Sequence, residues 1–250
     1  MESRTVWSMK CLTPSRLTEV LIGQGCLQGA TMVACMGAQH KPMLEPITDL
    51  FFHEQKHRYR YKGNWLQHSP TKALSWDMDP AVKQRIEATR AQWEPRGNTT
   101  HAAAEAVLLG QTVEDAGEWQ PWVDAVKTQW LLCESEPVAV EYNVCDPIRS
   151  VGGRFDCLLK YDGKVILADV KSVSSERAVA ARKPATAQLG AYSSMVLLHH
   201  HDLTIDRVAT VVIGPGDSRV IFGDTADAID AWEEAWGRYQ AHLKLTELPF

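Results

Sequence analysis

The sequence has no hydrophobic run of the roughly 18 residues that a membrane-spanning helix needs. Its first residues, MESRTVWSMKCLTPSRL, contain no apolar signal core, so we expect an intracellular, cytoplasmic protein without a membrane partner. The six cysteines form no CxxC pair and no regular framework. We therefore expect reduced, mostly buried thiols, and neither a zinc site nor an iron–sulfur cluster.

The chain also lacks an excess of basic residues. Its net charge of −5 gives no overall basic footprint for nucleic acid, which argues against a tight non-specific nucleic-acid binder. An enzyme with one local groove is not excluded, because acidic metal ligands lower the formal charge until a cation binds. Basic residues cluster at 57–62, 149–154 and 176–183. We interpret the first two clusters as solvated faces and only the third as a candidate phosphate track.

Motifs of other enzyme classes are missing or misleading. No Gly-x-Ser-x-Gly motif supports a serine hydrolase, and GPGD at 214–217 is a turn because no Lys-Ser/Thr follows it. His199, His200 and His201 suggest a metal cluster, but three consecutive side chains on a helix diverge. We interpret them as a solvated helix end.

The length of 250 residues allows one large domain or a domain with an appended helical part. We expect an N-terminal, mostly helical or irregular region over residues 1–95, packed on a core over residues 96–250. In the first region, a helix start signal lies at Thr13-Pro14-Ser15. The periodicity of residues 51–66 does not decide between a short hairpin and a helix. A helix is predicted over 79–93, with Asp79 as its cap and Pro80 at its first position.

Residues 96–250 have a clearer pattern of periodic and turn residues. Asn98 or Thr99 is expected to cap a helix that stops at Gly110, and Asp162-Gly163 is a strong tight-turn signal between two strands. The predicted order is helix 100–110, helix 118–132, strands 138–144, 153–161 and 164–171, helix 186–199, strands 207–213 and 219–222, and a helix from Thr225. This order predicts an α/β fold with a central mixed sheet flanked by helices.

The helix predicted over 118–132 carries an aromatic stripe. Trp119, Trp122, Val126 and Trp130 recur near helical spacing. A stripe of this kind is more typical of a packed core than of a base-stacking platform.

Two carboxylates and a lysine lie on adjacent predicted strands. Asp156 is on the first strand, and Asp169 and Lys171 share one face of the next. Carboxylates hold hard divalent cations, and a lysine adds positive charge where an attacking water and a phosphate meet. This pattern indicates metal-assisted phosphodiester hydrolysis. The alternative is a structural one, in which Asp156 and Asp169 form salt bridges with Arg154 and Lys171.

Two further pairs are spaced four residues apart on predicted helices, so each pair shares a helix face. His101 and Glu105 form the first pair, and the histidine is a candidate ligand that favours manganese beside magnesium. Gln188 and Tyr192 form the second, on the helix that follows the strand with Lys171. Both residues of this pair can contact a phosphate or the lysine, or can be ordinary surface groups.

Together these segments resemble the PD-(D/E)xK nuclease superfamily, in its RecB-like exonuclease branch. GNTTHAAAE is similar to the GxxxHxxxE helix of that branch, and VGGRFD to its GxxD strand. ADVK is similar to its DxK strand, and QLGAY to its QxxxY helix. The likeness extends from Gly97 to Tyr192 and is shared with mitochondrial genome maintenance exonucleases and phage RecB-like nucleases. Val170 and Ser172 stand where relatives often have an aromatic residue and a threonine.

The resemblance implies a restriction-endonuclease-like core and assigns roles to the candidate residues. His101, Asp156, Asp169 and the backbone carbonyl of Val170 would bind one or two Mg²⁺ or Mn²⁺ ions. Lys171 would be the catalytic lysine. Further catalytic roles fall to Glu105, Gln188 and Tyr192. Iron–sulfur members of the branch flank this core with four cysteines, which the chain lacks.

We therefore expect a metal-dependent deoxyribonuclease, an exonuclease that acts on single- or double-stranded DNA ends in recombination, repair or phage DNA processing. A structure-specific or restriction-type endonuclease is the alternative within the same enzyme class. A catalytically silent DNA-binding subunit is the alternative outside it, and RNA stays open as a substrate. Polarity, processivity and oligomeric state do not follow from the sequence, so a homo-oligomer or a recombination partner protein both stay open.

Overall fold

The computed structural model describes residues 44–246 of the chain. The helix predicted after Thr13 lies outside these residues. The described elements are β1 (Leu50–His53), the 3₁₀ helix η1 (Glu54–Lys56), β2 (Arg58–Tyr61), β3 (Asn64–Trp65), α1 (Pro70–Ser75), α2 (Pro80–Ala88), α3 (Arg90–Leu108), the 3₁₀ helix η2 (Gly117–Trp119), α4 (Gln120–Thr128), α5 (Trp130–Glu134), β4 (Glu136–Asp146), β5 (Val151–Tyr161), β6 (Lys164–Ser172), α6 (Glu176–Ala181), α7 (Thr186–His199), β7 (Arg207–Gly214), β8 (Asp217–Asp224) and α8 (Thr225–Thr246).

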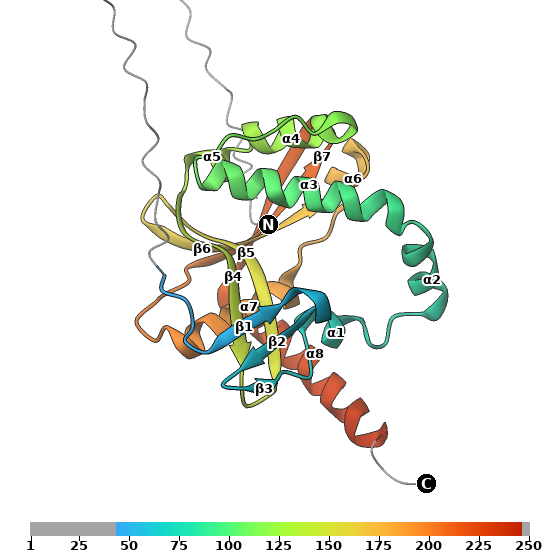
Figure 1. Cartoon of the computed structure of the whole chain (residues 1–250), viewed down its shortest axis with the longest axis vertical. Coiled ribbons are helices and arrows are strands. Elements are labelled where there is room, and N and C mark those ends of the chain that lie inside the picture. Colours follow the sequence, from blue (N-terminus) through green and yellow to red (C-terminus); the bar gives the residue numbers. More distant parts are fainter. Residues whose placement is uncertain (1–43, 247–250) are drawn as a thin grey trace, which may run out of the picture. The chain divides into compact units, whose positions relative to one another are not determined.

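A five-stranded sheet forms the centre of the fold, in the order β4-β5-β6-β7-β8 (Figure 1). The pair β6–β7 is parallel and the other three pairs are antiparallel. Asp162 and Gly163 have φ values of 48° and 71° and form the predicted tight turn between β5 and β6. A parallel pair needs a long crossover, which α6 and α7 provide. The predicted α/β fold with a mixed sheet flanked by helices is confirmed.

Helices cover both faces of this sheet (Figure 1). On the first, the α3 face, apolar residues of α3, α4 and α5 pack against Cys157, Ala168 and Val170 of the sheet. On the second, the α7 face, α7 and α8 pack against β4, β5 and β6 through residues such as Phe155 and Leu167. Strands β4, β5, β6 and β7 therefore each contribute side chains to two separate apolar layers.

A separate three-stranded antiparallel sheet, β1-β2-β3, lies beside β4 and β5. Leu50 and Leu66 bury their side chains against Cys145 of β4. A Cβ at Gly152 would stand 2.7 Å from Cβ of Tyr59, so glycine is needed for this close approach. The undecided segment is thus a hairpin. The described part of residues 1–95 combines this sheet with α1, α2 and the start of α3.

The helix that carries His101 begins earlier than predicted. Helix α3 starts at Arg90 and passes through Pro95, so Asn98 and Thr99 lie inside it and cap nothing. Proline leaves the carbonyl four residues before it without a donor, and that residue, Ala91, is exposed to water. The predicted stop is confirmed, because Gly110 has a φ of 64° just beyond the last turn. Asp79 caps α2 as predicted, with its carboxylate accepting from the amide of Ala81.

The helix predicted over 118–132 is divided. It comprises η2, α4 and α5, and the break lies at Gln129, whose side chain accepts from Leu131 N at 2.6 Å. The break rotates Trp130 out of the stripe, and its side chain is 37% exposed. Within the aromatic stripe, Val126 is fully buried and the two remaining tryptophans are half-buried. None of the described helices is long and apolar enough to cross a membrane.

Candidate metal centre

The alternation of side chains along β4 is interrupted at Glu141, and along β5 at Asp156; we call this point the bend. Val140 packs in the α3 face and Tyr142 in the α7 face, although residues two apart in a regular strand share a side. The same switch occurs on β5 between Phe155 and Cys157. Glu141 has a φ of 48°, in the left-handed region that a non-glycine residue adopts only under local strain. Strain of this kind is typical of functional sites.

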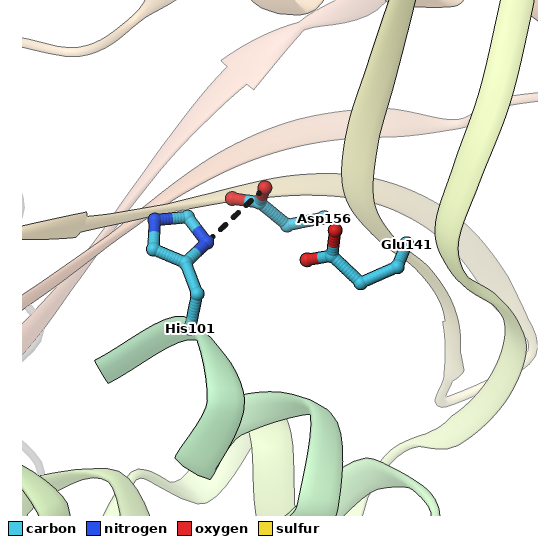
Figure 2. Close-up of side chains that lie close together, drawn as sticks. All are labelled: His101, Glu141 and Asp156. Atoms are coloured by element: carbon cyan, nitrogen blue, oxygen red, sulfur yellow. Dashed lines mark ion pairs between the residues drawn. The ribbon is translucent and has the colours of Figure 1, made fainter. Parts of the chain in front are cut away.

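Glu141 and Asp156 stand opposite each other at this bend. The pairs Val140–Cys157 and Tyr142–Phe155 flank them in the register of the two strands. His101 reaches the same point from α3, and its Nδ1 lies 3.3 Å from Oδ1 of Asp156 (Figure 2). One nitrogen or oxygen of each of the three residues lies within 4.8 Å of the others. Three ligand atoms from three elements therefore converge on one point.

Asp169 and Lys171 form the neighbouring part of the site. The ammonium of Lys171 lies 2.9 Å from Oδ1 of Asp169, to which it donates, and 2.8 Å from Oδ2. Asp169 is only 2% exposed. The salt bridge of Asp169 with Lys171, which the structural alternative predicts, is therefore present. The predicted salt bridge of Asp156 with Arg154 is not, because Asp156 pairs with His101. Arg154 instead lies 3.7 Å from Glu141 and donates to Asn143.

The ionisable groups at this point perturb one another. Burial, together with the nearby charge of Asp156, raises the pKa of Glu141 to about 7. Burial also raises the pKa of Asp156, but the His101 ring, Lys171 and the Val170 amide outweigh it, and the net pKa is below the usual range. Burial lowers the pKa of His101, but its hydrogen bond and ion pair with Asp156 outweigh burial, so the pKa is raised overall. For Asp169, burial raises the pKa and Lys171 only partly offsets it.

These residues fit a divalent cation. Oδ2 of Asp169 is buried, and its partner is the ammonium of Lys171, 2.8 Å away. Two carboxylates, Glu141 and Asp156, face each other across adjacent strands, where like charges are destabilising. A cation between Glu141 and Asp156 would remove this repulsion. Carboxylate oxygens with one imidazole nitrogen suit several divalent metals, so the set alone does not choose among them.

The other predicted site residues lie around this point in different ways. Val170 donates its amide to Oδ2 of Asp156 at 2.6 Å, while its carbonyl stays a predicted ligand. Gln188 donates to the hydroxyl of Tyr192 at 3.2 Å, and burial raises the pKa of that tyrosine. Glu105 is half-buried on α3; its charge contributes to the raised pKa of Glu141, but it is not among the three converging residues.

A motif glycine explains how Tyr192 enters the site. A Cβ on Gly153 would lie 2.8 Å from Cε1 of Tyr192. The tyrosine ring therefore packs directly on the backbone of β5, three residues before Asp156. This contact ties the helix with Gln188 to the strand that carries the carboxylate.

Glu141 was missed as a ligand in the sequence. It is an acidic residue inside the apolar run VAVEYNV, on the strand that precedes Asp156. Asp156 was identified by the same signal, an acidic residue inside an apolar strand. The register of the hairpin places Glu141 and Asp156 opposite each other. The register depends on a bulge between Pro137 and Ala139, which no residue pattern marks.

Comparison with known proteins assigns the chain to no family. A scan of protein-family models and a search of curated proteins found no match. Among solved structures, one similar chain is described as the crystal structure of SSO0001. It is 14% identical, with a TM-score of 0.29, and the match covers 67% of this chain and 73% of that one. A likeness this weak carries no argument about fold or function.

Proposed function

We propose that the protein is a metal-dependent nuclease that hydrolyses DNA phosphodiester bonds, with Mg²⁺ or Mn²⁺ at the point where His101, Glu141 and Asp156 converge. The convergence of these three ligand atoms within 4.8 Å, beside a buried Asp169–Lys171 pair, carries the proposal. Each feature has a structural explanation by itself. Their combination at one strained bend lacks one, because a fold gains little from holding five ionisable groups together, partly shielded from water, without a ligand.

The side chains of the site would have separate roles. When bound, a divalent cation supplies Lewis acidity for attack by water on phosphorus. His101, Glu141 and Asp156 would hold the ion, with Asp169 as a predicted further ligand, and the Val170 amide fixes the orientation of Asp156. Lys171 sits on the same strand as Asp169 and presents its ammonium at the edge of the site, where it would stabilise charge that develops on phosphate oxygens.

Gln188 and Tyr192 act as positioning residues in this proposal. The ring of Tyr192 extends from α7 onto Gly153 of β5, and Gln188 donates a hydrogen bond to its hydroxyl. The order of the elements also supports a restriction-endonuclease-like core of the RecB-like kind. Helix α3 with its histidine precedes the hairpin β4–β5, then β6 with Asp169 and Lys171, and then α7.

The favoured reaction is exonucleolytic removal of nucleotides from DNA ends. Purified protein is incubated with linear and with closed circular DNA in Mg²⁺ or Mn²⁺, and Asp169→Asn is run in parallel. We expect linear DNA to disappear from its ends, circles to stay intact, and the variant to be inactive. An active Asp169→Asn variant would point to a contaminating nuclease.

Other outcomes select the alternatives. Nicked or linearised circles would indicate an endonuclease on the same centre. A mobility shift without cleavage in either metal would leave a DNA-binding subunit and contradict the proposed reaction. A parallel RNA substrate tests the sugar, because metal-assisted hydrolysis does not itself reject a 2′-hydroxyl.

A further inference from the structure

The three-stranded sheet has one face that the candidate metal centre does not use. In the strand register, Phe51 pairs with Arg60 and His53 with Arg58, and Arg60 pairs in turn with Trp65. Paired residues of antiparallel strands project to the same side. We call this side the β1–β3 outer face; it comprises Phe51, His53, Arg58, Arg60 and Trp65.

The outer face combines aromatic rings with positive charge. Phe51 is 57% exposed, Trp65 is half-buried, and both arginines are exposed. Lys56 Nζ and the guanidinium carbon of Arg58 lie 4.9 Å and 5.3 Å from the centroid of the Trp65 ring. Between residues 50 and 67 the chain has four lysines and arginines against one glutamate, whereas the whole chain has a net charge of −5. The segment that forms this face is therefore positively charged, whereas the chain as a whole is negatively charged.

The opposite side of the small sheet supplies its stability. Leu50, Tyr59 and Tyr61 belong to the apolar cluster around Cys145, and Tyr59 packs against Gly152. Folding thus uses the inner side, and nothing in the described core requires an exposed phenylalanine beside the cationic strand β2. An exposed ring among exposed cations is a candidate binding surface.

The small sheet is also joined to the candidate metal centre. The guanidinium of Arg154 lies 4.7 Å from the centroid of the Phe52 ring, which is on the inner side of β1. The same guanidinium lies 3.7 Å from the carboxylate of Glu141. One side chain therefore separates β1 from a proposed metal ligand. In Figure 1, the small sheet lies across β4 and β5, the two strands that carry Glu141 and Asp156.

We propose that the β1–β3 outer face binds a single-stranded stretch of nucleic acid next to the catalytic centre, an inference that rests on the proposed nuclease function. Unpaired bases stack on aromatic rings while lysines and arginines follow the phosphates. In a duplex the bases are already stacked on one another, so the rings would find no partner. The row Phe51–Arg60–Trp65 alternates ring, cation and ring across the three strands, which matches a strand and not an acidic peptide.

Binding is measured by fluorescence anisotropy of a labelled 20-nucleotide oligo-dT in EDTA, so that no cleavage occurs. The test variant is Phe51→Ala/Arg60→Ala, and the matched control is Ile148→Ala/Arg238→Ala, which removes an exposed apolar residue and an exposed arginine elsewhere. We expect the test variant to bind at least tenfold more weakly and the control to stay within twofold of wild type. A second variant, Lys56→Ala/Arg58→Ala, keeps the rings and should lessen the salt dependence of binding. Thermal melting confirms that each variant is folded.

Several results would overturn the assignment of this face. Equal binding by the test variant and the wild type would show that the strand lies elsewhere, and so would an absence of oligo-dT binding by wild type. Displacement of the oligonucleotide by poly-glutamate as readily as by unlabelled oligo-dT would indicate an acidic-peptide surface instead. Asp169→Asn separates this inference from the proposed reaction. If that variant and the wild type both bind oligo-dT but neither cleaves DNA, the reaction is wrong and the surface stands.

Discussion

The open end and the middle of the hairpin β4–β5 carry carboxylates in opposite settings. At the open end, near the Asp162-Gly163 turn, Glu136 stands opposite Lys160, and both side chains are exposed. At the middle, Glu141 stands opposite Asp156, and both are half-buried among further ionisable groups. Opposite charges across strands stabilise a sheet by a few tenths to about 1 kcal/mol, and like charges destabilise it. One hairpin therefore follows this rule at its open end and departs from it at its middle.

The middle of the hairpin is where the fold departs from what its own stability favours. Glu136 needs no partner beyond water and Lys160. Glu141 has a strained backbone and a carboxyl with a pKa of about 7. A bound cation accounts for both features together, because positive charge favours the ionised carboxylates and offsets the cost of the left-handed backbone that aligns them.

Removal of the ammonium should have the largest effect on the reaction. We expect Lys171→Ala to fold and to bind metal, while its single-turnover cleavage rate falls by on the order of 10²-fold or more, as when one electrostatic stabiliser of a transition state is lost. If the Lys171–Asp169 pair had only a structural role, its loss would cost about 3 to 5 kcal/mol of stability, because a buried carboxylate loses its partner, and would leave cleavage by the folded protein near normal. A rate within a few-fold of wild type would end the proposed role of this lysine.

Neutralising the like-charge pair should change stability in an unusual direction. We expect Glu141→Gln to raise the free energy of unfolding by about 1 to 3 kcal/mol at pH 8 in EDTA, since burial and Asp156 disfavour the ionised form. The pKa of Glu141 is raised from 4.5 to about 7 in the folded protein, so wild-type stability falls as pH rises through this window. The advantage of the variant should therefore disappear near pH 4. Urea unfolding at both pH values measures this, and a destabilised variant at pH 8 would contradict it.

How far the sequence could predict this site is shown by individual residues. Asp156, Asp169 and Lys171 were identifiable because polar residues interrupt two apolar strands joined by an Asp-Gly turn. His101 was identifiable from its motif, but the start of its helix was not, because Pro95 suggests a boundary and an exposed carbonyl tolerates it. The outcome at Glu141 depends on a bulge and a left-handed residue, which are set by tertiary packing.

The hairpin β1–β2 also could not be predicted from its local sequence. Its sequence alternates arginine and tyrosine, but aromatic and basic residues suit a helix or a strand, so local periodicity did not decide. Packing of Tyr59 on Gly152, almost a hundred residues later, selects the strand. Long-range contacts of this kind have no signal in a window of ten or fifteen residues.

A substitution at Glu136, at the open end of the hairpin, should have the smallest effect on stability. We expect Glu136→Gln to lower the free energy of unfolding by less than about 1 kcal/mol, equally at high and low metal concentration, because it removes only an exposed opposite-charge neighbour. Thermal melting with EDTA and with Mn²⁺ measures this. A metal-dependent change at this position would place a cation at the open end of the hairpin and contradict its placement at Glu141 and Asp156.

Isothermal titration of the protein with Mn²⁺ tests the central claim most directly. Wild type, Glu136→Gln and Glu141→Gln are titrated at pH 8 after removal of bound metal. We expect wild type and Glu136→Gln to bind Mn²⁺ with the same affinity, and Glu141→Gln to bind at least tenfold more weakly, because a neutral amide replaces one of two facing carboxylates. Equal affinity in all three proteins, or no binding by wild type, would contradict a cation between Glu141 and Asp156.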